Sequence, residues 1–284
     1  MPAPYTLMGV LDLTPASPSE YGAPFDVDAA VARGVRMAGA GAAVIDVGAE
    51  ATAAMDHDVP AAVEIRRIVP VVEGLVAERP GTVVSIDTTK AVIARAALAA
   101  GATHVNDISG LRSDPDMLPA VVEHGASCCL VHMRGTPRTM QGHTRYEDVV
   151  QDVRWFLERR VDVAVTAGVD PTRIAVDPGV GFSKTPEQDL EVLRRLREFT
   201  TIGCPVMVGT SRKGFVPHLT GRDDPAQHLG AAIATAVVAL QHGATIFRVH
   251  DVAPVADALA MAAHLPWPTI APRAADRMLE LGVR

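Results

Sequence analysis

Short apolar runs recur along the whole chain, and each is followed by a polar or Gly-rich turn and then by a stretch with helical spacing. The runs are too short for helices and do not alternate with polar residues, so we predict strands that are buried on both faces. The eight runs are Leu7–Leu13, Ala43–Val47, Val83–Asp87, His104–Ile108, Cys128–Met133, Ile174–Asp177, Val206–Gly209 and Ile246–His250.

The stretches between these runs are rich in Ala and Leu, and their apolar spacing predicts amphipathic helices over Lys90–Ala100, Glu187–Phe199 and Ala226–Gln241. Eight strand–helix units favour an α/β fold of the (β/α)8 TIM-barrel type, with residues 1–284 as a single domain. A doubly wound open sheet is the alternative, because periodicity alone does not show closure. We expect a short helix over Arg273–Leu281 to close the barrel.

Composition adds limits to the possible partners. The formal charge is −7 and the pI about 5.8, so the sequence has no basic excess to attract nucleic acid or anionic lipid. There is no leader-like segment and no long uncharged apolar run, so we expect a cytoplasmic protein. The three cysteines have no disulfide or zinc spacing, and we interpret them as small buried hydrophobes.

Polar residues end most of the predicted strands. In a parallel barrel the carboxyl ends of the strands form one mouth, and this mouth is where barrel enzymes build their sites. A desolvated charged cluster there is costly without a ligand, so a binding site is the favoured interpretation. We interpret Asp46 and Asp107 differently, as helix caps or loop anchors. The strand-end residues are Asp12, Glu50, Asp87, Asn106, His132, Arg134, Asp177, Ser211, Arg212, Lys213, Arg248, His250 and Asp251.

The mixture of polar groups at this mouth indicates the kind of ligand. Asp87, Asn106 and Asp177 are acceptors suited to a planar ring edge that carries N–H donors. Arg248 and His250, together with Lys213, suit an anionic group such as a phosphate. The alternative is that Arg248 only forms a structural ion pair with Asp251.

The same positions carry a resemblance to a known family. Six motifs occur in the family's order, and the chain resembles dihydropteroate synthase, an enzyme of folate synthesis. The motifs are Ser85-Ile-Asp-Thr-Thr-Lys90, Asn106-Asp-Ile-Ser-Gly110, His132-Met-Arg-Gly-Thr-Pro137 with Met140-Gln141, Asp177-Pro-Gly-Val-Gly-Phe182, Ser211-Arg-Lys213 with Phe215, and Arg248-Val-His-Asp251.

The resemblance implies a barrel, commonly a homodimer, that joins 6-hydroxymethyl-7,8-dihydropterin pyrophosphate to 4-aminobenzoate and releases pyrophosphate with Mg2+. It implies catalytic roles for Asp87, Lys213, Arg248 and His250, with the last two facing the pyrophosphate. The implied pterin pocket consists of Asp87, Asn106, Met133, Asp177, Phe182 and Lys213. The implied acceptor side consists of Thr52, Ser211 and Lys213.

Two loops depart from the family's pattern. In the first, Asp12 replaces the amide that the resemblance places on the metal, and magnesium favours such hard anionic oxygens. Ala16 replaces a carboxylate in the same loop. In the second loop, Ala53 and Ala54 stand where the family has Arg and Pro, although Thr52 is retained.

These changes leave three hypotheses. The chain is an ordinary dihydropteroate synthase, or a specialised relative that uses the pterin cation with another acceptor, or a pterin-binding protein without catalysis. A methyltetrahydrofolate-using methyltransferase is a fourth reading, which Ser211-Arg-Lys213 and Arg248-Val-His250 disfavour.

Overall fold

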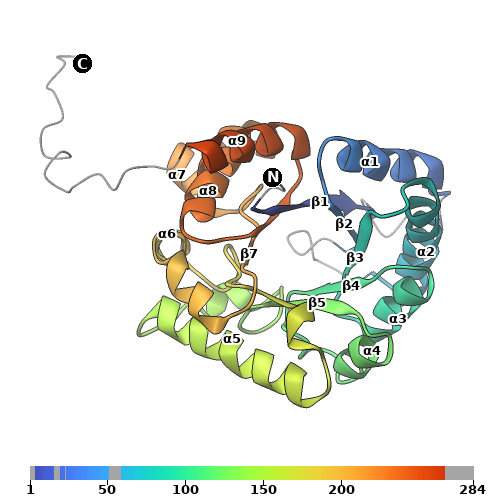
Figure 1. Ribbon diagram of the computed structural model, residues 1–284, viewed down its shortest axis with the longest axis horizontal. Coiled ribbons are helices and arrows are strands. Elements are labelled where there is room, and N and C mark those ends of the chain that lie inside the picture. Colours follow the sequence, from blue (N-terminus) through green and yellow to red (C-terminus); the bar gives the residue numbers. More distant parts are fainter. Residues whose placement is uncertain (1–3, 16–19, 23, 51–58, 266–284) are drawn as a thin grey trace, which may run out of the picture.

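The computed structural model describes residues 4–15, 20–22, 24–50 and 59–265, and within them the parallel strands form a barrel surrounded by helices (Figure 1). The strands are β1 Thr6–Asp12, β2 Val44–Gly48, β3 Val83–Asp87, β4 His104–Asp107, β5 Ser127–Val131, β6 Ile174–Asp177, β7 Met207–Val208 and β8 Ile246–Val249. The helices are α1 Val27–Gly39, α2 Ala61–Glu78, α3 Ala91–Ala99, α4 Met117–Glu123, α5 Val149–Thr166, α6 Pro186–Arg194, α7 Phe215–Thr220, α8 Leu229–Gln241 and α9 Val252–His264.

The strand order confirms the predicted barrel. Neighbouring strands pair in the order β6-β5-β4-β3-β2-β1-β8-β7, and every pair is parallel. The circle closes through one bridge between Val176 and Val206, with the amide of Val176 donating to the carbonyl of Pro205 at 3.0 Å. This closure excludes the doubly wound open sheet. The expected helix over Arg273–Leu281 lies outside the described residues.

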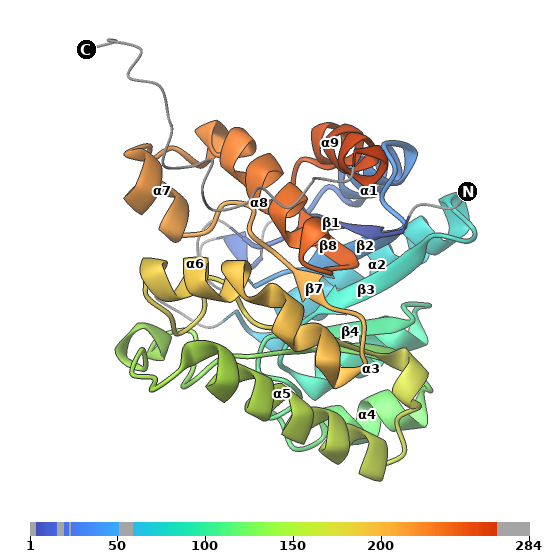
Figure 2. The ribbon, with the colours of Figure 1, turned by 60° about the vertical axis from the view of Figure 1, so that its left-hand side comes forward.

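The helices cover the outer face of the strands, and Figure 2 shows α5, α6 and α8 passing across one side of the barrel. The main core lies between the two layers, where Ile45 and Val47 of β2 belong to the same buried cluster as Ile68 and Leu75 of α2. A smaller apolar cluster, which includes Met8, Cys129 and Met207, brings together side chains from strands around the barrel. Burying these branched and unbranched aliphatic chains supplies most of the stabilisation of such a fold.

Two predicted helices differ in their bounds. The segment predicted as Glu187–Phe199 is α6 followed by a 3-10 helix over Leu196–Ile202, because the chain tightens at Arg195. The segment predicted to begin at Ala226 starts with a 3-10 turn at Pro225–Gln227, and the α-helix begins only at Leu229.

Cys128 and Cys129 are buried free thiols, as expected, and Cys204 is partly exposed. Burial raises the pKa of Cys128 to about 12, so its thiol is unreactive at neutral pH. Across the residues that the structure describes, we find no helix with both the length and the apolar character needed to cross a membrane.

Candidate active site

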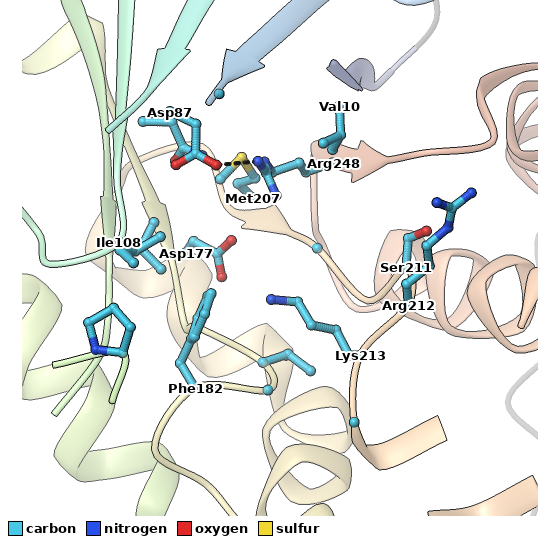
Figure 3. Close-up of a pocket in the computed structure, with 18 of the residues that line it drawn as sticks. Val10, Asp87, Ile108, Asp177, Phe182, Met207, Ser211, Arg212, Lys213 and Arg248 are labelled. Carbon is cyan, nitrogen blue, oxygen red and sulfur yellow. Dashed lines mark hydrogen bonds and ion pairs between the residues drawn. The ribbon is translucent and has the colours of Figure 1, made fainter. Parts of the chain in front are cut away.

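A cavity of about 530 Å³ opens at the carboxyl ends of the barrel strands (Figure 3). Eleven of the predicted strand-end and pterin-pocket residues line it together, although they come from seven strands and the loops after them. They are Asp12, Glu50, Asp87, Asn106, Asp177, Phe182, Ser211, Arg212, Lys213, Arg248 and His250. The structure therefore brings the predicted acceptors and the predicted cations into one space.

Met133 does not line this cavity, so its predicted place in the pterin pocket is wrong. Strand β5 ends at Val131, and the chain after it carries Met133 to a separate cavity of about 450 Å³ beside Arg112 and Phe156. Val131 and Met207 line the main cavity in its place. Thr52 and the altered positions Ala16, Ala53 and Ala54 lie outside the described residues.

The local backbone fixes the acceptor Asp177. Its Oδ1 accepts a hydrogen bond from the amide of Gly179 at 2.7 Å, so one carboxylate oxygen anchors the loop after β6. Gly179 has a φ of +70°, and a Cβ there would lie 2.0 Å from the carbonyl oxygen of His132. Burial raises the pKa of Asp177. Figure 3 shows its carboxylate directed into the cavity, toward the amine of Lys213.

Lys213 and Phe182 lie against each other in the wall of the same cavity. The ammonium nitrogen of Lys213 lies 3.8 Å from the centroid of the Phe182 ring, a cation–π contact that holds the amine over the ring face. Burial, and then the charge of Arg248, lower the pKa of Lys213 to about 8. The amine is thus a cation at neutral pH that can lose its proton just above it.

Arg248 is held by two carboxylates. Its Nε donates to Asp46 at 2.7 Å and its Nη2 donates to Asp87 at 2.5 Å. Asp251 instead approaches Arg212, at 3.7 Å, so the alternative pairing of Arg248 with Asp251 is wrong. Burial raises the pKa of Asp87 to about 7, although the charge of Arg248 opposes this rise.

The interpretation of Asp46 as a cap or loop anchor is also wrong. Asp46 lies within β2, is fully buried, and accepts from Ser85, Asn106 and Arg248. The alternation of a strand offered a signal, because Asp46 and Gly48 are two residues apart and share one face. Asp107, in contrast, accepts from the amide of Ser109 at 2.7 Å and is the predicted loop anchor.

His250 is not a cation in the free site. Its Nδ1 lies 2.9 Å from the hydroxyl of Ser211. Burial, and then the charges of Arg212 and Arg248, lower the pKa of His250 to about 4. His250 therefore offers a neutral imidazole to an anion, and a bound polyanion would favour its protonation.

Comparison with known proteins decides the family. Residues 8–250 match the family model of pterin binding enzymes. The dihydropteroate synthase of Mycobacterium leprae is 45% identical over 264 residues, which cover 90% of this chain and 92% of that protein. This chain belongs to the dihydropteroate synthase family.

Solved members of the dihydropteroate synthase family share the fold throughout. The Xanthomonas albilineans enzyme with 4-aminobenzoic acid superposes with a TM-score of 0.83 at 38% identity, covering 97% of this chain and 94% of that one. The same enzyme in complex with 7,8-dihydropteroate gives a TM-score of 0.80 at 37% identity, covering 97% and 95%.

The sequence predicts Asp12 as the ligand of the Mg2+ that the resemblance implies, and this residue lines the cavity. Asp12 ends β1, is exposed to the cavity, and accepts with Oδ1 from the amide of Thr14 at 2.8 Å. Among the described residues there is no group of three or more side chains that could hold a metal ion. A single carboxylate fits Mg2+, since this ion is commonly bound by one or two carboxylates together with substrate phosphates and water.

Proposed function

We propose that this protein joins 6-hydroxymethyl-7,8-dihydropterin pyrophosphate to 4-aminobenzoate, forming dihydropteroate and releasing pyrophosphate. The observation that carries the proposal is the cavity in which the acceptors Asp87, Asn106 and Asp177 converge with the cations Lys213 and Arg248. Family membership and the similarity to an enzyme solved with 7,8-dihydropteroate support it.

The acceptors match the pterin. The amino-pyrimidinone edge of a pterin carries N–H donors, which Asp87, Asn106 and Asp177 can accept. Lys213 supplies a donor for the ring's acceptor atoms from its place over Phe182. The cavity is large enough for one bicyclic ring and its substituent, since ligand pockets commonly begin at about 300 Å³.

The reaction needs charge to be stabilised in two directions. The bond between the exocyclic carbon and the pyrophosphate oxygen breaks, the amine nitrogen of the acceptor forms the new bond, and the amine's proton passes to solvent. Arg248 and the N–H of His250 face the leaving diphosphate, while the carboxylates favour the cationic pterin fragment. Asp12 would hold Mg2+, and the ion would supply further positive charge for the leaving diphosphate.

The altered loops keep a second candidate function in view. Ala53 and Ala54 replace a cation and a rigid turn that family members carry beside the acceptor, and Ala16 replaces a loop carboxylate. These three substitutions favour a relative that captures the same pterin cation with another amine or acceptor. A pterin-binding protein without turnover is the third outcome of the test.

The test follows pyrophosphate release from the pterin pyrophosphate with Mg2+, with and without 4-aminobenzoate, and identifies the products by mass. We expect coupled formation of dihydropteroate. Pyrophosphate release that does not depend on 4-aminobenzoate would support the second candidate, and pterin binding without turnover would support the third. Lys213→Met, prepared in the same way, controls for enzyme from the expression host.

We further propose that the protein is a cytoplasmic homodimer, as the family resemblance implies. Sedimentation of the purified protein at micromolar concentration checks the dimer, and a single monomer boundary would contradict it. Cell fractionation checks the compartment.

A further inference from the structure

Asp46 lies beneath the cavity and binds three of its neighbours. It is fully buried in β2 and is not among the residues that line the cavity. Its Oδ1 accepts from the hydroxyl of Ser85 at 2.5 Å, and its Oδ2 accepts from Arg248 Nε at 2.7 Å and from Asn106 Nδ2 at 3.2 Å. Two of these three donors belong to residues that line the cavity.

The contact with Asp46 decides which way the Asn106 amide faces. A carboxylate oxygen that already takes a guanidinium proton can only accept, so the NH2 group of Asn106 must turn toward Asp46. The carbonyl Oδ1 of Asn106 then lies on the other side of the amide. It is buried and has no hydrogen-bond partner among the described residues.

An acceptor in that condition indicates a ligand donor. Leaving a buried acceptor without a partner is costly, and an N–H from a bound ring would remove that cost. If the amide were free to rotate, Asn106 would present a donor in half of its orientations, and it would repel the N–H of the ring. Asp46 therefore determines that Asn106 presents an acceptor, and not a donor, to a ligand in the cavity.

Asp46 also orients Arg248. Together with Asp87 it binds the guanidinium at Nε and Nη2, and Nη1 has no hydrogen-bond partner among the described residues. A planar guanidinium gripped at two of its nitrogens has a fixed direction for the third. That third nitrogen is available to an anionic group of the ligand.

We propose that Asp46 is a positioning residue that makes Asn106 an obligate acceptor for a ring N–H and directs Arg248 toward the diphosphate. The proposal rests on the proposed function for the identity of the ligand. It assigns no contact between Asp46 and the ligand, since Asp46 acts through its two neighbours.

A double-mutant cycle tests the first half of the proposal. Calorimetry measures binding of 6-hydroxymethyl-7,8-dihydropterin, which lacks the diphosphate, to wild type, Asp46→Ala, Asn106→Ala and the double variant. We expect Asp46→Ala to weaken binding by about tenfold, as for one lost neutral hydrogen bond. The double variant should bind within about threefold of Asn106→Ala alone, because the two residues act as one unit.

The second half is tested by the ratio of affinities for the pyrophosphate ester and the free alcohol. This ratio should fall in Asp46→Ala and stay unchanged in Asn106→Ala. Asp46→Asn should rescue binding, because its amide oxygen can still accept from Arg248 and Asn106 while its NH2 faces Ser85. Ser85→Ala is the matched control, since it removes a bond to Asp46 without touching Asn106 or Arg248.

Additive losses in the cycle, an unchanged ester-to-alcohol ratio, or an Asp46→Asn variant as weak as Asp46→Ala would each overturn the proposal. If thermal denaturation shows that Asp46→Ala is unfolded, Asp46→Val replaces it in the cycle, because valine fills the volume without providing an acceptor. A wild type that binds the pterin without turnover refutes the proposed function alone, because the cycle measures binding only. A wild type that binds no pterin refutes both.

Discussion

Replacing Asp177 by Asn converts one acceptor of the cavity into a donor with almost no change of shape. In the native protein Oδ1 accepts from the amide of Gly179 at 2.7 Å, and an Asn oxygen can keep that bond. The amide nitrogen must then take the place of the other oxygen, in a side chain that Figure 3 shows directed into the cavity. An N–H donor of the pterin would meet a second donor there.

The magnitude follows from the contact that is lost. A hydrogen bond to a charged group contributes about 1.5–3 kcal/mol, so losing it should raise the dissociation constant of the pterin by about 10- to 150-fold. The loop after β6 should stay in place, because its bond from Gly179 survives. The thermal midpoint of Asp177→Asn should therefore remain close to that of wild type.

Calorimetric titration with the pterin measures the effect, and Asp189→Asn is a matched control. Asp189 is also buried and accepts from a nearby loop amide, that of Gly181, at 2.7 Å, but it does not line the cavity. An Asp177→Asn variant that binds as tightly as wild type would show that Asp177 does not contact the ring. Equal losses in both variants would point to the loop and not to the contact.

Further predictions concern protonation and the backbone. Asp87 must be ionised to accept a hydrogen bond from the ring, and its pKa is about 7, so kcat/KM should fall below pH 7. Lys213 must be charged, and its pKa is about 8, so kcat/KM should also fall above pH 8. A flat profile between pH 6 and 9 would contradict this assignment. Arg248→Met should move the fall of kcat/KM on the acid side to higher pH, because it removes the charge that opposes the rise in the pKa of Asp87. If that fall does not move, a group other than Asp87 causes it. Gly179→Ala should destabilise the protein by about 2–4 kcal/mol in urea unfolding, because its Cβ meets the carbonyl of His132, and wild-type stability would mean that the loop relaxes freely.

Much of the fold could be predicted because each strand of the barrel has its own local sequence pattern. Each strand is a short apolar run, and the polar residue at its end marks the side of the site. Asp87, Asp177 and Lys213 were found by this rule, which needs no knowledge of long-range pairing. Closure of the circle at Val176 and Val206 required the eight-fold count and could not be read from any one segment.

The rest of the site depends on contacts between distant parts of the chain. Arg248 lies 202 residues from Asp46 and 161 from Asp87, so no local sequence pattern indicates that it pairs with them. The neutral state of His250 depends on burial among cations from another loop. Met133 was misplaced because an apolar residue next to a strand end looks the same whether the strand continues or stops.

The strands of the barrel are not paired equally well around the circle. Between β6 and β7 it depends on a single bridge and on a β7 of only two residues, whereas the junction of β1 with β2 pairs five residues. Asp177 lies at the end of one side of this seam, and Ser211 and Lys213 follow the other. A slight separation of β6 from β7 would widen the cavity beside Asp177 and Lys213, without disturbing β2, which carries Asp46 on the far side of the circle.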